Sequence, residues 1–196
     1  MRTHSHLLMT AVLNDGLKSI HVPVHPRALL LGSILPDLPL LVLTLGFLAR
    51  RSWSGVPAAA DPICGPHFND LYFHHPFWIA AHNLLHAPLL IGLLAWLGYH
   101  PGLRRQKKGG LALFWFALAC GFHALIDIIT HNNDGPLLLF PFNWRYRFPA
   151  PVSYWDAEHG GKNFTLFERL LDFAAAVYLA VAWRRRRRSF KAKEMR

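Results

Sequence analysis

Cysteine is scarce in this chain of 196 residues, which contains only Cys64 and Cys120. Two thiols can build neither a disulfide framework nor a zinc site made of thiolates. Acidic residues are also few, because 11 Asp and Glu stand against 21 Lys and Arg and 13 His. The hydrophobic content of 53% is too high for a disordered basic protein, and the length is that of one ordinary domain.

Long stretches of the chain lack charge. The 22 residues between Arg27 and Arg50 contain one charged side chain, Asp37, and the 23 residues of 77–99 contain none. A third apolar stretch covers 111–129 and is interrupted only by Asp127. Since about 20 apolar residues in a helix cross a bilayer, these stretches predict three membrane-spanning helices.

A fourth candidate span, Leu166–Trp183, is weaker because Glu168, Arg169 and Asp172 lie in its first two turns. Each segment alone could be a buried helix of a soluble protein, but three long ones in one chain favour a membrane protein. We therefore predict an all-α, integral membrane helical bundle of about four spans. Residues 1–183 would form a single membrane-embedded helical domain, and 184–196 a basic cytoplasmic tail.

Basic residues gather on one side of the predicted spans. Fifteen of the 21 Lys and Arg lie there, namely Arg2, Lys18, Arg27, Arg104, Arg105, Lys107, Lys108, Arg184 to Arg188, Lys191, Lys193 and Arg196. The positive-inside rule makes this side cytoplasmic, although Arg50 and Arg51 lie opposite. Each basic run adjoins an apolar segment, so we expect the tail to contact anionic lipid headgroups and expect no nucleic-acid partner.

The first predicted span carries its single acidic residue, Asp37, between two prolines. Pro36 precedes it directly and Pro39 follows two residues later, in a segment that begins with Gly32. Two prolines this close together should break or kink the helix there. Backbone amides freed by the break can support the Asp37 carboxylate, and a plain N-cap of the following half-helix is the alternative.

Histidine and aspartate recur at a spacing of four in the next two spans. His82 and His86 lie in the second, and His123, Asp127 and His131 in the third. This spacing places side chains on one helix face, so the residues form two polar stripes. Such groups are costly in hydrocarbon, and a divalent cation would neutralise the carboxylates. We predict a metal site with one or two ions, against the alternative of a purely structural polar network.

The order of these motifs resembles one known family. The chain has Thr3-His4, Gly32-x-x-Leu35-Pro36-Asp37, His82-x-x-x-His86 and His123-x-x-x-Asp127-x-x-x-His131, followed by Gly135-Pro136 and Pro141. This pattern resembles the predicted inner-membrane metal-dependent hydrolases, also described as LexA-binding, inner-membrane-associated hydrolases. It is more faintly similar to the all-helical zinc-dependent phospholipases C.

The resemblance implies a multi-pass protein of the bacterial inner membrane that binds a divalent metal, with zinc as the expected ion. It implies metal ligands at His4, Asp37, His86, His123, Asp127 and His131, with His82 as a less certain match. His4 conflicts with the predicted topology, because the chain would start on the cytoplasmic side while the stripes lie toward the other.

The segment Asn132–Lys162 is long and contains seven aromatic residues, with Arg145 and Arg147 between them. Such a composition suits the headgroup level of a bilayer. A second interpretation is a cover over the metal site in which Arg145 and Arg147 bind a substrate phosphate.

These features predict a membrane-embedded hydrolase that cleaves a phosphoester or acyl bond of a lipid or other amphiphile. Asp37 would be the catalytic group that orients a metal-activated water or takes its proton. Two other functions stay open: a metal-ion or proton transporter that uses the same His/Asp cluster, and a non-catalytic membrane protein with a structural metal.

Overall fold

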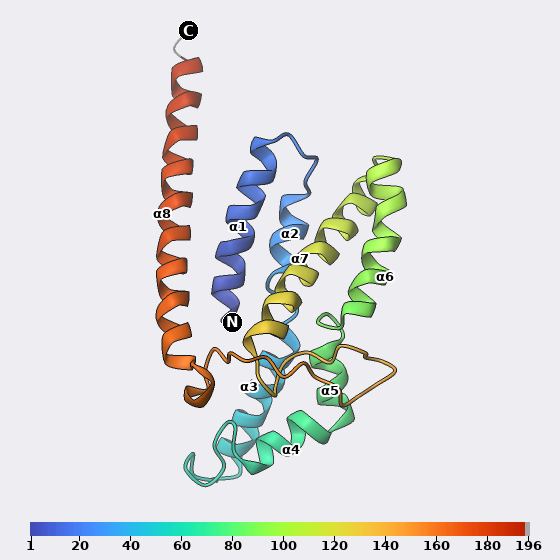
Figure 1. Cartoon of the computed structure of the whole chain (residues 1–196), viewed down its shortest axis with the longest axis vertical. Coiled ribbons are helices and arrows are strands. Elements are labelled where there is room, and N and C mark those ends of the chain that lie inside the picture. The colour runs from blue at the N-terminus through green and yellow to red at the C-terminus, as the bar shows by residue number, and fades with distance from the viewer. Residues whose placement is uncertain (195–196) are drawn as a thin grey trace.

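The computed structural model describes residues 1–194, with side chains up to Arg188, and its regular structure is helical (Figure 1). The predicted all-α class is confirmed. The only strand-like pairing among the described residues is an isolated bridge between Leu137 and Arg147. Residues 131–156, which make up most of the predicted aromatic segment, contain no helix.

Eight α-helices and two short helical turns follow one another along the described chain. They are α1 (Thr3–Ser19), α2 (Pro26–Gly32), α3 (Leu38–Trp53), α4 (Pro66–His74), α5 (Pro76–Asn83), α6 (Pro88–Tyr99), the π-helical η1 (His100–Arg104), α7 (Lys108–Thr130), the 3-10 turn η2 (Ala157–His159) and α8 (Gly161–Glu194). Proline opens α2, α4, α5 and α6, where its fixed φ suits the first turn and its missing N–H costs no helical bond.

Helix α7 is the centre of the bundle and packs against α2 and α6. Gly32 ends α2 directly against α7, since a Cβ added there would overlap the carbonyl oxygen of Phe116. Gly98 lets α6 approach in the same way, because a Cβ at this position would lie 2.5 Å from the backbone nitrogen of Phe114. These close approaches hold α2 and α6 beside the helix that carries His123 and Asp127.

The first two predicted spans are interrupted. Residues 33–37 form turns between α2 and α3, so the expected kinked helix is two helices joined at Asp37. The second span breaks at 84–87, before Pro88, and its halves are bent by 43°. Both breaks coincide with proline, which cannot donate the backbone bond that would continue a helix.

One helix of the described chain, α7, is long and apolar enough to cross a membrane. Helix α5 and the continuous segment α6–η1 form a bent pair. This pair qualifies as a second span if it is counted as one broken helix. Core helices of soluble proteins can be equally long and apolar, so this finding alone is a weak sign of membrane association. Within residues 1–194, neither the first predicted span nor the fourth qualifies.

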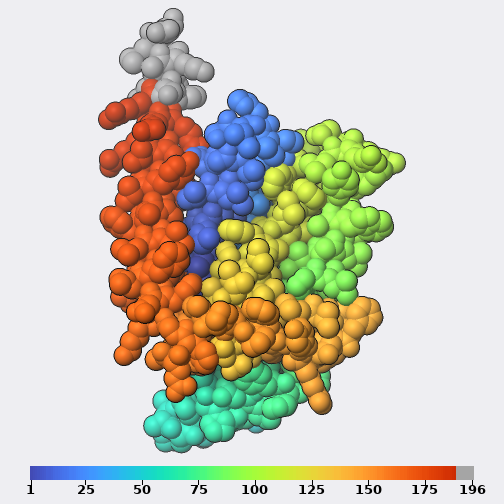
Figure 2. Space-filling view, viewed as in Figure 1, coloured from blue at the N-terminus to red at the C-terminus, as the bar shows by residue number. Residues whose placement is uncertain are grey.

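The basic connections lie together at one end of the molecule. The end of α1, the link from η1 to α7 and the C-terminal half of α8 are all at the top of Figure 1. In Figure 2 the segment after α7, in orange, crosses the molecule between this bundle and the lobe that contains α4.

Helix α8 lies at the edge of the bundle and packs against α1. It continues through Arg184–Arg188 to Glu194, so the predicted basic tail is the last part of the same helix as far as it is described. The side chains of Lys191 and Lys193, and all of Arg196, lie outside the described residues.

Candidate metal centre

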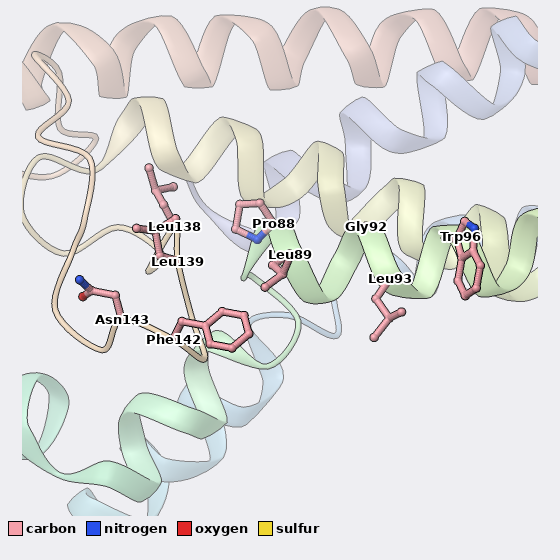
Figure 3. A pocket seen from close by; sticks show the side chains of 9 residues that line it. All are labelled: Pro88, Leu89, Gly92, Leu93, Trp96, Leu138, Leu139, Phe142 and Asn143. Atoms are coloured by element: carbon pink, nitrogen blue, oxygen red, sulfur yellow. The ribbon is translucent and has the colours of Figure 1, made fainter.

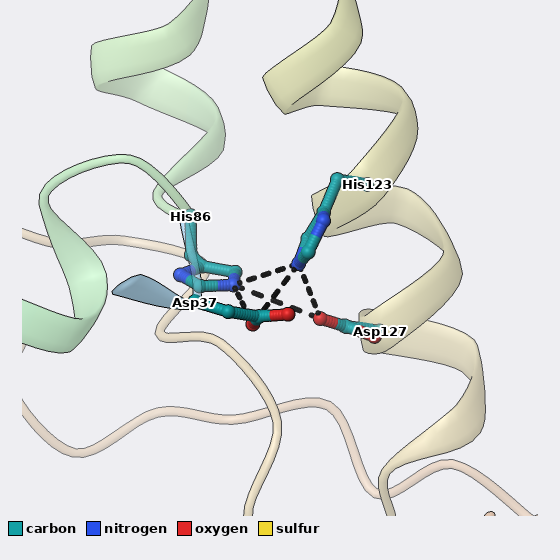
Figure 4. A group of neighbouring side chains, drawn as sticks. All are labelled: Asp37, His86, His123 and Asp127. Atoms are coloured by element: carbon teal, nitrogen blue, oxygen red, sulfur yellow. Dashed lines mark hydrogen bonds and ion pairs between the residues drawn. The ribbon is translucent and has the colours of Figure 1, made fainter. Parts of the chain in front are cut away.

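Four of the predicted ligands meet at one point (Figure 4). Asp37 comes from the turn between α2 and α3, His86 from the break between α5 and α6, and His123 and Asp127 from α7. One donor atom of each lies within 4.8 Å of all the others. His86, His123 and Asp127 are buried, whereas the Asp37 side chain is 24% exposed.

The distances between donor atoms are short and similar. His123 Nε2 lies 3.2 Å from Asp37 Oδ1 and 3.0 Å from Asp127 Oδ2. His86 Nε2 lies 3.6 Å from each of the same two oxygens. The two Nε2 atoms are 3.2 Å apart. All four side chains therefore point into one small volume.

The second nitrogen of each histidine fixes its tautomer. His86 Nδ1 lies 2.6 Å from the His82 carbonyl oxygen, and His123 Nδ1 lies 2.9 Å from that of Ser33. A carbonyl only accepts hydrogen bonds, so both Nδ1 atoms carry the proton and donate. In neutral imidazoles both Nε2 atoms then present lone pairs to each other and to two carboxylates.

This donor set fits a divalent cation. Four acceptors facing one another repel unless a positive charge lies between them or the histidines are protonated. The edge of a tetrahedron with zinc bond lengths is about 3.3 Å, close to the five donor distances of 3.0–3.6 Å. Hydrogen bonds from the remote nitrogens to carbonyl groups are the usual support for metal-binding histidines.

His4 is not part of this centre, contrary to the prediction. Its side chain is 61% exposed, and its Nε2 lies 3.2 Å from Asp172 Oδ2 on α8. His4 faces outward because residues two apart on a helix lie on nearly opposite faces, and the inward face is taken by His6.

His6 is the site residue that sequence reasoning missed. It is fully buried, its Nε2 lies 3.0 Å from Asp127 Oδ1, and its ring stacks on that of His123 at 3.8 Å between centroids. The amino group of Met1 donates to the same Asp127 oxygen at 2.9 Å. Asp127 Oδ1 is thus contacted by Met1 and by His6 of α1, while Oδ2 faces the two Nε2 atoms.

Thr3 also belongs to this face of α1, and its hydroxyl donates a hydrogen bond to Asp37 Oδ2. The sequence signal for an inward polar face is the spacing of His6, Thr10 and Asn14, which recur every four residues. The Thr3-His4 pair quoted for the family resemblance therefore has its threonine, and not its histidine, at the centre.

His82 is buried but uses its Nε2 elsewhere. The Tyr72 hydroxyl donates to the Asp134 carbonyl oxygen at 2.6 Å and lies 3.2 Å from His82 Nε2. Burial raises the pKa of Tyr72 above its ordinary value, so the hydroxyl keeps this proton. His82 then contributes its carbonyl oxygen, rather than its ring, to the support of His86.

His131 lies beside the centre without joining it. Its Nδ1 donates to the Asp127 backbone carbonyl at 2.9 Å and is 3.8 Å from Asp127 Oδ1. The ring packs on Tyr154 at 4.8 Å, and burial raises the pKa of Tyr154 to about 12. Among residues 1–188, whose side chains the structure describes, one group has metal-ligand geometry, so a second ion would have no separate ligand set there.

The two arginines of the aromatic segment have different surroundings. Arg147 donates to the Gly135 carbonyl oxygen and lies over the rings of Tyr72 and Phe73, at 5.3 and 5.4 Å. Arg145 is exposed, and both arginines line a cavity of about 390 Å³. None of the four ligands lines this cavity, so the arginines lie outside the centre itself.

No family model, curated protein or solved structure matches this chain. The resemblance to inner-membrane hydrolases therefore rests on the motifs alone.

Proposed function

We propose that the protein is a membrane-embedded, metal-dependent hydrolase. The observation that supports it most is the convergence of two imidazole nitrogens and two carboxylate oxygens on one small volume. Zinc is the ion we expect, because nitrogen and oxygen ligands at tetrahedral spacing suit it. When bound, such an ion acidifies a water molecule and polarises the bond under attack.

Membrane integration is part of the proposal. Helix α7 and the bent pair α5–α6 would supply two crossings, and the basic connections at one end agree with an orientation in which that end is cytoplasmic. Further crossings by α2–α3 and α8 would complete the bundle of about four spans. The site would then lie near the level of the aromatic segment, toward the non-cytoplasmic side of a bacterial inner membrane.

The four ligands have different expected roles. His86, His123 and Asp127 are buried and would bind the ion. Asp37 is the most exposed of the four, and the Thr3 hydroxyl holds its Oδ2. We therefore assign Asp37 the additional role of orienting the attacking water and accepting its proton.

An amphiphilic substrate suits the surroundings of the site. An apolar groove of about 700 Å³ runs along α6 from Pro88 to Trp96 and is bordered by Leu138, Leu139 and Phe142 (Figure 3). It begins two residues after His86 and can accept a hydrocarbon chain. The cavity beside Arg145 can accept an anionic headgroup, which makes a phosphoester or acyl bond of a lipid the proposed target.

Metal analysis tests the proposal. The detergent-purified protein should contain close to one zinc per chain, and Asp127→Ala should lose it. Asp70→Ala, which changes an exposed carboxylate of α4, is the control and should keep its metal. Hydrolysis of phospholipid in mixed micelles should follow metal content and fall at least about 100-fold in Asp37→Asn. A metal-free wild type, or full metal in Asp127→Ala, contradicts the proposal.

One observation favours a second candidate, an ion or proton transporter. His6 Nδ1, Thr10 Oγ1 and Asn14 Oδ1 are buried without a hydrogen-bond partner among the described residues. They are one turn apart and lead along α1 away from Asp127. Zinc uptake into sealed vesicles that is abolished by Thr10→Val would support this candidate over the hydrolase.

A further inference from the structure

The start of α1 is joined to α8 by partly buried polar contacts, which are made by Ser5 and by Arg2, the residue that precedes the helix. The Arg2 backbone N–H donates to Glu168 Oε1 at 2.7 Å, and its guanidinium donates to Oε2 at 3.0 Å. Glu168 is fully buried. The Ser5 hydroxyl adds a bond of 2.9 Å to Asp172, one turn along α8.

Other side chains of the same turn reach the metal centre. Thr3 donates to Asp37, and His6 contacts both Asp127 and the His123 ring. The short segment from Arg2 to His6 therefore connects a buried carboxylate on α8 with both carboxylates of the centre. Helix α8 itself contributes no ligand as far as it is described.

We infer that Glu168 is a positioning residue of the metal centre, which acts through the first turn of α1. Its two bonds to Arg2 fix how far α1 extends toward the centre and how it is rotated about its own axis. They thereby fix the positions of Thr3 and His6. Partners of ligand side chains typically change metal affinity 10- to 100-fold when they are lost. This inference rests on the proposed function, because it requires that the centre binds a metal.

The α1–α8 interface supplies a matched control at its other end. Asp15 of α1 accepts a hydrogen bond from Tyr178 Oη at 3.1 Å and pairs with Arg186, both on α8. Asp15→Asn and Glu168→Gln each remove one carboxylate from the same helix pair. Of the two carboxylates, only Glu168 bonds to the turn that carries Thr3 and His6.

Co²⁺ titration of the full-length protein in detergent tests the inference. Glu168→Gln should bind Co²⁺ about 10- to 100-fold more weakly than the wild type and shift the visible absorption bands that report ligand geometry. Asp15→Asn should keep the wild-type affinity and spectrum. Thr3→Val, which preserves side-chain shape and the contacts to α8, should also weaken binding and shift the bands, and it remains informative if Glu168→Gln fails to fold.

Each outcome decides something. Wild-type affinity and spectrum in Glu168→Gln, or in Thr3→Val if the first variant does not fold, overturn the inference. Equal weakening in Asp15→Asn also overturns it, since the effect would then be general loosening of the helix pair. If the wild type takes up no Co²⁺, the proposed function fails, and this inference fails with it.

Discussion

At the scale of single residues, the remote nitrogen of each histidine decides what the ring can bind. His86 and His123 give their Nδ1 protons to carbonyl groups and direct Nε2 into the centre, so both can act as ligands. His82 directs its Nε2 toward Tyr72 instead. The spacing of four between His82 and His86 is compatible with two ligands, and only the position of Tyr72 separates their roles.

His6 and His4 provide a prediction at this scale. His6→Ala should weaken zinc binding about 10-fold, because it removes the ring that contacts Asp127 and stacks on His123. His4→Ala, two residues away on the exposed face, should leave zinc binding unchanged. Competition with a chromophoric chelator measures both affinities. The opposite order would mean that His4, as the family resemblance implies, is the ligand.

At the scale of the elements, the two breaks in the apolar segments, at 33–37 and 84–87, position ligands of the metal centre. Each one turns one ligand, Asp37 or His86, toward α7. Helical periodicity predicted the stripe on α7, because His123 and Asp127 lie in one continuous helix. The same periodicity marks a polar face of α1 at His6, Thr10 and Asn14, but whether that face meets Asp127 depends on how α1 packs against α8 and α2.

Gly32 provides a prediction for these elements. Gly32→Ala should force α2 away from α7, because the added Cβ would overlap the Phe116 carbonyl oxygen. We expect destabilisation of about 1–3 kcal/mol and weaker zinc binding, since Asp37 follows α2 closely. Gly46→Ala on α3, where nothing lies within 4 Å, should be neutral or stabilising by up to about 1 kcal/mol. Unfolding in detergent, with and without zinc, measures both.

At the scale of the whole molecule, α8 carries much exposed apolar surface, which the proposed membrane setting would cover with lipid. Helix α8 buries Glu168 and Ala175 and exposes large apolar side chains on its other faces, among them Leu166, Phe167, Leu170, Phe173, Val177 and Val181. The hydropathy of 166–183 is lowered by Glu168 and Asp172, both of which contact the first turn of α1. In the sequence alone, these carboxylates argue against a membrane span. The structure shows that both side chains point toward α1.

Labelling of single cysteines tests the proposed orientation. Cys64 is exposed in the loop between α3 and α4, whereas Cys120 is buried in α7. A membrane-impermeant maleimide added to intact spheroplasts should label Cys64. Ser19→Cys in a Cys64→Ser background, at the basic end of α1, should be labelled only after permeabilisation.

The pH dependence of Cys64 labelling distinguishes access of the maleimide to the thiol from the chemical reactivity of the thiol. Although Cys64 is exposed, the surrounding loop removes part of the water around its thiol, and this desolvation raises the pKa of the thiol. The thiolate is the form that reacts. Labelling should therefore speed up as the pH rises and continue to do so above pH 9, without the dependence on permeabilisation that Ser19→Cys shows. If Cys64 and Ser19→Cys are labelled from the same side at every pH, the two ends of the molecule share one compartment, and the bundle cannot cross the bilayer between them.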